Sequence, residues 1–208
     1  PRLVSSAASD VYKRQKGLQG HTAYPQLAKN PLNALVQLMH SLSEESLDIG
    51  SEHFDASTLV ITSIDTGNSA TNVIPEMAKA VINIRFNDNH TSESIKKWLE
   101  RTSKDFAEKT GTEITVDTHT SGESFLTPPG QLSDIICNSI EQELGVKPSL
   151  STTGGTSDAR FIKNICPVVE FGLVGKTMHA IDERVEISQI RNLKKVYTRI
   201  LENYFTEI

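Results

Sequence analysis

The chain has 208 residues, of which 37% are hydrophobic, and a formal net charge of −5. This is enough apolar sequence for one sizeable core or two small ones. Lysines and arginines are scattered among acidic residues instead of forming a basic stripe, which argues against a nucleic-acid partner. No apolar run reaches the length that crosses a bilayer, so no membrane partner is expected.

The two cysteines, Cys137 and Cys166, have neither a CxxC spacing nor any other paired spacing. The sequence therefore predicts neither a disulfide framework nor a thiolate metal site. Together with the lack of a signal-peptide pattern, this favours a reducing, cytoplasmic location.

Residues 1–15, PRLVSSAASDVYKRQ, lack an initiator methionine and show no clear periodicity. We expect this segment to be a non-native or truncated leader, with the first domain covering residues 16–122. A turn-rich PPG sequence at residues 128–130 breaks both helix and strand. We therefore expect a second domain over residues 123–208.

The pattern from Lys16 onward predicts strand, helix, strand, strand, helix, strand. Residues 16–25 are interpreted as the end of an edge strand, and Pro31 opens an amphipathic helix. Alternating segments at 57–65 and 78–86 predict an antiparallel pair of strands. A second helix runs from its cap at Thr91 to Gly111, and a last strand covers residues 113–118. This order indicates a ferredoxin-like, split βαβ domain.

The remaining chain predicts pieces of an α/β layer that are too few to complete one. Helices are expected over 132–144, 159–163 and 187–205, and a strand buried on both faces over 167–171. That strand leads into a loop with His179, and ligands bind past the carboxyl ends of strands in open α/β sheets. From the residues alone, His179 fits a metal ligand or an ordinary solvated histidine.

Three segments together resemble the M20 metallopeptidase family: GLQGHTAYP, GGTSDARF and TMHAIDE. The resemblance implies a ferredoxin-like dimerisation lid followed by the last part of a zinc-peptidase-like catalytic domain. It implies a homodimer formed through the lid, a small-molecule substrate, and two zinc ions per subunit with cobalt as a possible substitute. His179 matches one zinc ligand. The other ligands of the family, including its HxD motif, have no match, since Glu44-Glu45 is better explained as a solvated helix end.

The resemblance also implies roles for residues of the lid. His21 matches a histidine that crosses the dimer interface to stabilise the oxyanion in the partner's active site. Tyr24 matches a nearby substrate contact, and Asn72 an asparagine that contacts substrate across the dimer. Without the resemblance, His21 would be interpreted as a turn histidine with a structural hydrogen bond.

Four further residues match positions that line the family's substrate pocket. Arg85 in NIRF matches an arginine that binds a substrate carboxylate, a task suited to its bidentate donors. Ser121 in TSGESFLT, and Gly155 and Thr156 in GGTSD, match other pocket residues. Unaided, Arg85 would be interpreted as a solvated strand arginine.

Within the family, the SGxxFLT and GGTSD segments favour the desuccinylases. The resemblance implies zinc-dependent hydrolysis of N-succinyl-LL-2,6-diaminopimelate to succinate and LL-diaminopimelate, as in lysine and diaminopimelate biosynthesis. Since most metal ligands have no match, this chain alone is expected to be inactive. Two alternatives stay open: another amidohydrolase of the family, such as an acetylornithine deacetylase or a dipeptidase, and a non-catalytic dimerisation module.

Overall fold

The computed structural model describes residues 4–5, 7–152 and 157–206. The chain divides into two compact units. Ser6–Ser124 form one, called here the sheet unit, and Pro1–Ser5 with Phe125–Ile208 form the other, called the helical unit. No helix in the described ranges is long and apolar enough to cross a membrane.

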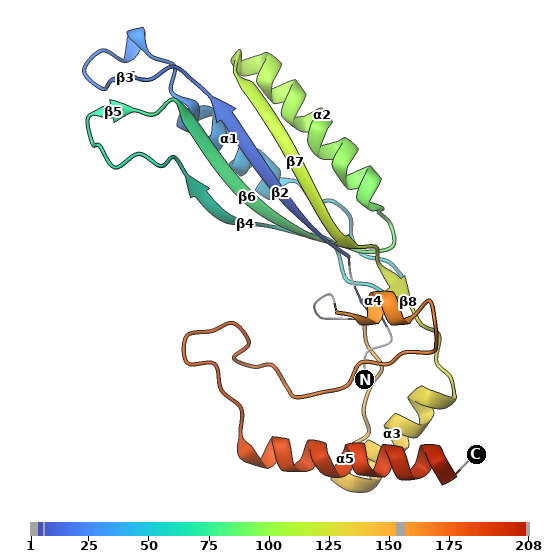
Figure 1. The fold of residues 1–208 in the computed structure, drawn as a ribbon. Coiled ribbons are helices and arrows are strands. Elements are labelled where there is room, and N and C mark those ends of the chain that lie inside the picture. Colours follow the sequence, from blue (N-terminus) through green and yellow to red (C-terminus); the bar gives the residue numbers. More distant parts are fainter. Residues whose placement is uncertain (1–3, 6, 153–156, 207–208) are drawn as a thin grey trace. The chain divides into compact units, whose positions relative to one another are not determined.

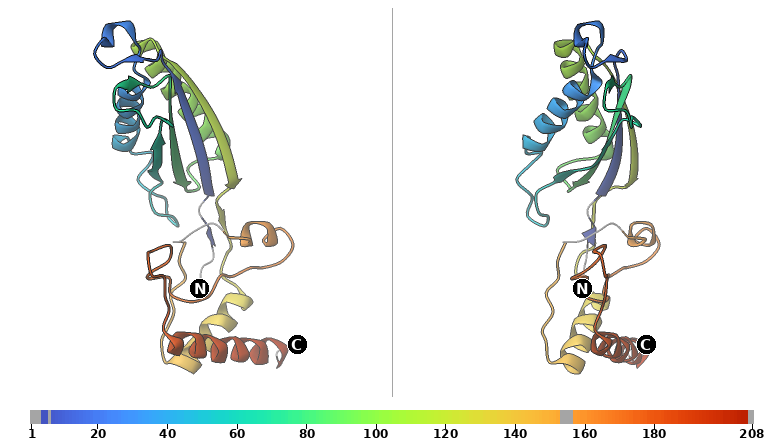
Figure 2. Two further views of the ribbon diagram at one scale, coloured as in Figure 1. Left: turned by 60° about the vertical axis from the view of Figure 1, so that its left-hand side comes forward. Right: turned by 90° about the vertical axis from the view of Figure 1, so that its left-hand side faces the viewer.

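The sheet unit is built on four antiparallel strands in the order β4-β6-β2-β7 (Figure 1). Helices α1 and α2 both cover the same face of this sheet (Figure 2). The element order is strand, helix, strand, strand, helix, strand, so the predicted ferredoxin-like arrangement is confirmed. The elements are β2 (Ala7–Lys16), α1 (Pro31–Glu44), β4 (Thr58–Asp65), β6 (Met77–Phe86), α2 (Ser92–Thr110) and β7 (Glu113–Gly122).

The core of the sheet unit lies between the sheet and its two helices. Every second residue of β6 from Ala78 to Phe86 is buried, because successive strand side chains point to opposite faces. These residues pack against Leu35 of α1 and against Ile95 and Leu99 of α2, which are almost fully buried. Burying an aliphatic side chain of this size stabilises by about 1.5–3 kcal/mol. The other face of the sheet carries both polar and apolar side chains, among them Arg85 and the exposed Val60.

Local signals fix the ends of both helices. Asn30 precedes α1 and its side chain accepts a 3.0 Å hydrogen bond from the Leu32 N–H. Thr91 and Ser94 form a reciprocal capping box at the start of α2. Gly111 ends α2 with φ of 60°, a left-handed conformation that glycine adopts without steric cost.

The structure corrects the expectation of an edge strand over residues 16–25. Residues 7–16 pair with β6 on one side and with β7 on the other, so β2 is an inner strand and residues 7–15 belong to the sheet. Its inward-facing positions include Lys13 and Gln15, both fully buried, and these polar residues hid the strand's alternation. Lys13 Nζ donates to Ser103 Oγ at 3.0 Å, whereas the Gln15 amide has no hydrogen-bond partner among the described residues.

The helical unit contains two long helices, α3 (Gln131–Leu144) and α5 (Ile187–Thr206), and the short α4 (Ala159–Ile162). Two short strands, β1 (Val4–Ser5) and β8 (Phe125–Leu126), pair antiparallel. Ile136 and Ile140 of α3 and Val196 of α5 form a small buried cluster. Arg199 of α5 also lies 2.8 Å from Glu143 of α3. The unit therefore rests mainly on one helix pair.

The buried strand expected over residues 167–171 is not formed, and this prediction was wrong. Val168 and Val169 are only half-buried. A strand buried on both faces needs neighbouring strands and covering helices. In the described part of the helical unit, β1 and β8 pair only with each other, so no sheet is present for this segment to join.

Candidate functional site

His21 lies in a small two-stranded ladder of the sheet unit, beyond the end of β2. The ladder pairs β3 (Gly20–His21) with β5 (Val73–Ile74), and His21 lies opposite Val73. Its Nδ1 accepts a 3.0 Å hydrogen bond from the Ala23 N–H. An imidazole nitrogen that accepts carries no proton, so neutral His21 holds its proton on Nε2. The exposed side chain therefore offers an Nε2–H donor.

Tyr24 and Asn72 lie beside His21. The Tyr24 N–H donates to the His21 carbonyl at 2.9 Å, and the two ring centroids are 6.1 Å apart. The Thr22 N–H donates to the Asn72 carbonyl at 3.0 Å. Three of the residues expected to contact substrate or intermediate are thus grouped at one end of the sheet unit, called here the tip group: His21, Tyr24 and Asn72.

The segment that carries Asn72 is braced by Asn68, a residue whose role the sequence did not predict. Its Nδ2 donates to the Val73 carbonyl at 2.8 Å and to the Ala70 carbonyl at 3.2 Å. Its Oδ1 accepts from the Ala70 N–H at 3.0 Å. The sequence Gly67-Asn68-Ser69 is typical of a turn, and asparagine is favoured in turns because its amide can satisfy nearby backbone groups.

Arg85 and Ser121 lie toward the opposite end of the sheet and form a second group. Both adjoin Ala8 of β2: Arg85 is its partner on β6, and Ser121 Oγ donates to the Ala8 carbonyl at 3.1 Å. Arg85 Nε donates to Asn83 Oδ1 at 3.1 Å. The tip group follows Lys16, which pairs with Met77 at the other end of β6. Eight strand residues at about 3.4 Å each separate the two ends by about 27 Å.

His179 lies in an exposed loop of the helical unit, and this loop is held together by hydrogen bonds between its own residues. The Thr177 hydroxyl donates to the Arg184 carbonyl at 2.8 Å and accepts from the Arg184 N–H at 3.0 Å. The His179 N–H donates to Glu183 Oε2 at 3.3 Å. His179 and Asp182 have φ of 60°, unusual for residues with a side chain, and such strained positions cluster at functional sites. Gly155 and Thr156 lie outside the described residues.

The implied zinc centre can be tested against the chemistry of these side chains. A structural or catalytic zinc site takes at least three His, Cys, Asp or Glu ligands. Within the described ranges, no three such side chains are grouped so as to hold a metal ion. His179 and its neighbours therefore do not by themselves form the site that the sequence resemblance implies.

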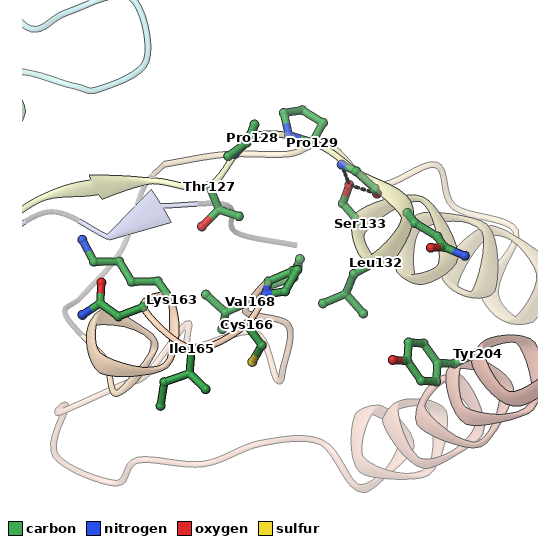
Figure 3. A pocket seen from close by; sticks show the side chains of 15 residues that line it. Thr127, Pro128, Pro129, Leu132, Ser133, Lys163, Ile165, Cys166, Val168 and Tyr204 are labelled. Atoms are coloured by element: carbon green, nitrogen blue, oxygen red, sulfur yellow. Dashed lines mark hydrogen bonds between the residues drawn. The ribbon is translucent and has the colours of Figure 1, made fainter. Parts of the chain in front are cut away.

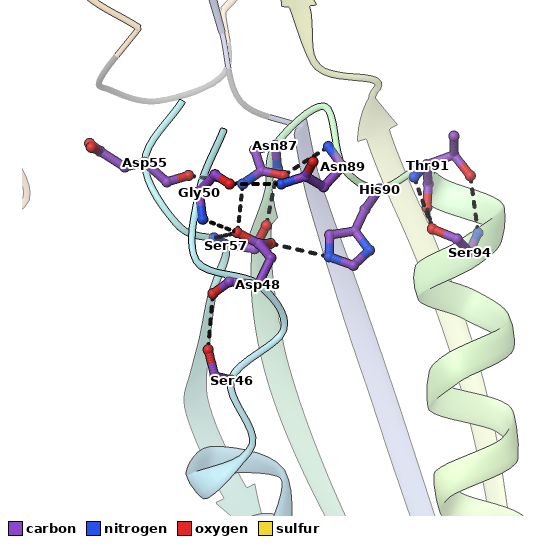
Figure 4. Close-up of polar contacts among 10 residues, drawn as sticks. All are labelled: Ser46, Asp48, Gly50, Asp55, Ser57, Asn87, Asn89, His90, Thr91 and Ser94. Atoms are coloured by element: carbon purple, nitrogen blue, oxygen red, sulfur yellow. Dashed lines mark hydrogen bonds and ion pairs between the residues drawn. The ribbon is translucent and has the colours of Figure 1, made fainter. Parts of the chain in front are cut away.

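The sequence also provided no indication of a polar network around Asp48 (Figure 4). Asp48 Oδ1 accepts from the Gly50 N–H at 2.7 Å, the Ser57 N–H at 3.1 Å and Asn87 Nδ2 at 2.7 Å. Burial acts to raise the pKa of Asp48. The hydrogen bonds from the side chain and N–H of Ser57, the Gly50 N–H and the Asn87 side chain outweigh it and lower the pKa to about 2. His90 Nε2 also lies 3.1 Å from Asp48 Oδ2. This network joins the loop before β4 to the end of β6.

A cavity of about 830 Å³ lies in the helical unit (Figure 3). Its lining is largely apolar and includes Leu132, Ile165, Val168 and Tyr204. His179 is not among the lining residues. The cavity is therefore not the site that the sequence motifs indicate.

Comparison with known proteins places the sheet unit in a defined class. Residues 12–111 match the peptidase dimerisation domain family. The chain is 58% identical over 190 residues to succinyl-diaminopimelate desuccinylase of Cereibacter sphaeroides, and 53% identical over 189 residues to that of Paracoccus denitrificans. Each alignment covers 91% of this chain and 50% of the relative. The chain thus spans about half the length of the curated relatives it matches.

Solved structures agree on the fold. The dipeptidase Dug1p of Saccharomyces cerevisiae gives a TM-score of 0.81 at 14% identity, covering 98% of this chain and 55% of that one. Human carnosine dipeptidase 1 gives 0.80 at 16% identity, covering 96% and 55%. The family match and the shared fold together define a protein with a peptidase dimerisation domain. The chain belongs to the M20 peptidase family.

Proposed function

We propose that the whole protein hydrolyses N-succinyl-LL-2,6-diaminopimelate to succinate and LL-diaminopimelate, as an amide hydrolase that works as a homodimer. The relatives that match over 91% of this chain are named for succinyl-diaminopimelate desuccinylase activity. The chain contributes the dimerisation domain and a helical part of the second domain. The substrate carries several carboxylates, which suits a site that includes a positioned arginine.

The observation that carries the proposal is the separation of the tip group from Arg85 and Ser121. About 27 Å along one sheet is farther than an acyl amino acid of this size extends, so both groups cannot contact one substrate molecule within one subunit. A twofold axis that runs the two domains antiparallel can place the tip group of one copy beside Arg85 of the other. The distance thus supports a site that combines Arg85 of one subunit with His21 of its partner.

The dimer is expected to form through the sheet unit. β4 and β7 are the two edges of its sheet, and an unpaired edge is a template for a second chain. On β4, Val60 and Ile64 are exposed at 56% and 44%. We propose the β4 edge as the surface that pairs in the dimer.

Within that site, His21 is suited to stabilise negative charge. Its Nδ1 is engaged by the Ala23 N–H, which leaves Nε2–H as the donor. A donor aimed at the oxygen of a tetrahedral intermediate stabilises the charge that develops there. Tyr24 and Asn72 would hold the substrate beside it, and Arg85 would bind a carboxylate. Ser121 would add a polar contact to the substrate, and the sequence resemblance assigns the same role to Gly155 and Thr156.

The proposal assigns His179 as one metal ligand. A zinc ion bound by several such ligands would activate water for hydrolysis. Because the described residues supply no complete ligand set, the other ligands would come from the half of the relatives that this chain does not match. Taken alone, the chain would then act as a dimerisation module, which is the second candidate function.

A fusion tests the proposal. This chain is joined to the half of the Cereibacter sphaeroides relative that it does not match, and hydrolysis of N-succinyl-LL-2,6-diaminopimelate is compared with hydrolysis of N-acetylornithine. A preference for the succinyl substrate is expected, because a smaller acyl group leaves buried donors unpaired. Equal or better hydrolysis of N-acetylornithine would instead support a deacetylase.

A further inference from the structure

Three polar side chains form a chain of hydrogen bonds on the face of the sheet that the helices leave uncovered. Asp10 of β2 lies directly opposite Asn83 of β6, and Asn83 Nδ2 donates to Asp10 Oδ1 at 2.8 Å. Arg85 is two residues further along β6, on the same face. Its Nε donates to Asn83 Oδ1 at 3.1 Å. All three side chains are partly buried.

The chemistry of these groups leaves one orientation for the Asn83 amide. An ionised carboxylate only accepts hydrogen bonds, and a guanidinium only donates them. The amide NH₂ must therefore face Asp10, and the amide oxygen must face Arg85. A reversed amide would place donor against donor at Arg85 and acceptor against acceptor at Asp10. The amide of Asn83 can therefore bridge the carboxylate of Asp10 and the guanidinium of Arg85, because it both donates and accepts hydrogen bonds.

We infer that Asn83 is a positioning residue, which holds the guanidinium of Arg85 in the plane and direction needed to bind a substrate carboxylate. This inference rests on the proposed function, in which Arg85 binds that carboxylate. Because Asn83 Oδ1 accepts from Nε, the plane of the guanidinium is set before a carboxylate arrives. An arginine fixed before binding loses less rotational freedom when the substrate arrives.

Substitutions at position 83 by side chains of similar size are expected to affect Arg85 in different ways. Leucine fills the same space but removes both hydrogen bonds, so the Nε–H of Arg85 loses the acceptor that Asn83 provides. Aspartate keeps an acceptor for Arg85 but places a second carboxylate opposite Asp10 and competes with the substrate for the guanidinium. The double variant Asp10→Asn/Asn83→Asp restores the chain of hydrogen bonds while leaving the competing charge beside Arg85.

The first measurement uses the fusion enzyme. Asn83→Leu is expected to raise KM for the N-succinyl substrate about tenfold, with kcat within about twofold, because it weakens binding of a group remote from the reacting amide. Asn83→Asp should raise KM further, and the double variant should not restore it. Asn89→Leu is the matched control, since the Asn89 side chain bonds to the Gly50 carbonyl and not to Arg85.

The second measurement uses the 208-residue chain alone and needs no activity. ¹⁵N relaxation of the Arg85 Nε–H group should report a lower order parameter in Asn83→Leu than in the wild type and in the double variant. Backbone amide spectra confirm that each variant folds.

The two measurements separate the possible failures. If Arg85→Lys raises KM while Asn83→Leu changes neither KM nor the order of the Arg85 side chain, Asn83 has no positioning role. If Arg85→Lys leaves KM unchanged, the carboxylate-binding role of Arg85 in the proposed function is wrong. In that case the inference about Asn83 is overturned as well, whatever the relaxation data show.

Discussion

Asp48 accepts a 2.7 Å hydrogen bond from Asn87 Nδ2, and this bond ties the loop after α1 to the residue that follows β6. The Asn87 amide also donates to the Asp55 carbonyl at 3.0 Å, and its oxygen accepts from the Asn89 N–H at 2.9 Å. The Asn87 amide and the Asp48 carboxylate thus form hydrogen bonds with backbone groups in the loop after α1 and in the loop after β6. Those groups have no hydrogen-bond partners in the sheet.

Replacing Asp48 should destabilise the sheet unit. Asp48→Ala removes the carboxylate that accepts from the N–H groups of Gly50 and Ser57 and from the Asn87 amide. We expect a loss of about 1–3 kcal/mol in the free energy of unfolding, measured by urea denaturation. Asp88→Ala is the control, because Asp88 is exposed in the same region. Equal effects of the two changes would show that the network contributes nothing specific.

The same network predicts an acid-sensitive step in stability. The pKa of Asp48 falls from 3.8 to about 2 on folding, so the unfolded chain binds more protons between these values. This contribution is fully present above pH 3.8 and is lost as pH falls toward 2. Allowing for solvent screening, we expect about 1–2 kcal/mol. Unfolding measured from pH 5 to pH 2 should show a shallower fall in Asp48→Asn than in the wild type.

Lys13 predicts a pH dependence on the alkaline side. Burial lowers the pKa of Lys13 from 10.5 to about 7. Between pH 7 and 10.5 the unfolded chain binds more protons, so the contribution of Lys13 to stability rises with pH in this window. At or below pH 7 the cost of burying the amine is fully present. Lys13→Met should stabilise the chain at pH 7, on the order of 1–3 kcal/mol, and flatten this slope.

Lys16→Met provides the matched control for Lys13, because Lys16 is exposed on the same strand. It should change neither the stability at pH 7 nor the alkaline slope. If Lys13→Met destabilised the chain, the 3.0 Å hydrogen bond to Ser103 would have to outweigh the cost of burying the amine.

The fold of the sheet unit was predictable wherever the signals were local. The helix ends are marked by Asn30 with Pro31, by Thr91 and by Gly111. These residues act through local contacts with the backbone, so their effect depends little on the rest of the fold. Strand β2 was missed because Lys13 and Gln15 occupy inward positions, which the period-two pattern reserves for apolar residues. Its place in the sheet depends on pairing with β6 and β7, a nonlocal property.

The candidate site was predictable only in part, for a similar reason. The sequence motif that contains His21 also contains Tyr24, and the centroids of the two rings are 6.1 Å apart. No spacing in the sequence indicates that Asn83 would meet both Asp10 and Arg85, because that contact depends on the register of β2 against β6. The resemblance named the residue expected to bind substrate but not the one that orients it.

The chain as written should bind zinc weakly. One imidazole from His179 does not make a closed site, and the described residues add no cluster of ligands to it. Equilibrium dialysis should give a dissociation constant weaker than about 1 µM. Tighter binding at a defined stoichiometry, lost in His179→Ala but kept in His53→Ala, would show that the chain holds a metal site of its own.

The sheet unit should carry the dimer contact on its β4 edge. Val60→Lys adds an edge charge of the kind that opposes strand pairing, and Val60 is 56% exposed. We expect this change to shift the full chain toward monomer in sedimentation velocity. Thr115→Lys places the same charge on β7, the opposite edge, and serves as control. Dissociation by Thr115→Lys alone would assign the contact to β7.

His21 should contribute to the rate of the fusion enzyme and much less to its affinity. The charge that Nε2–H meets develops only in the transition state, so His21→Ala should lower kcat about 10²- to 10³-fold and change KM little. His53→Ala is the matched control, an exposed histidine of the same unit outside the tip group. Mixing His21→Ala subunits with Arg85→Ala subunits should restore part of the activity, because each mixed dimer keeps one site with both residues intact. A lack of restoration, with mixed dimers shown to form, would place His21 and Arg85 in the same subunit's site and contradict the separation of about 27 Å on which the shared site rests.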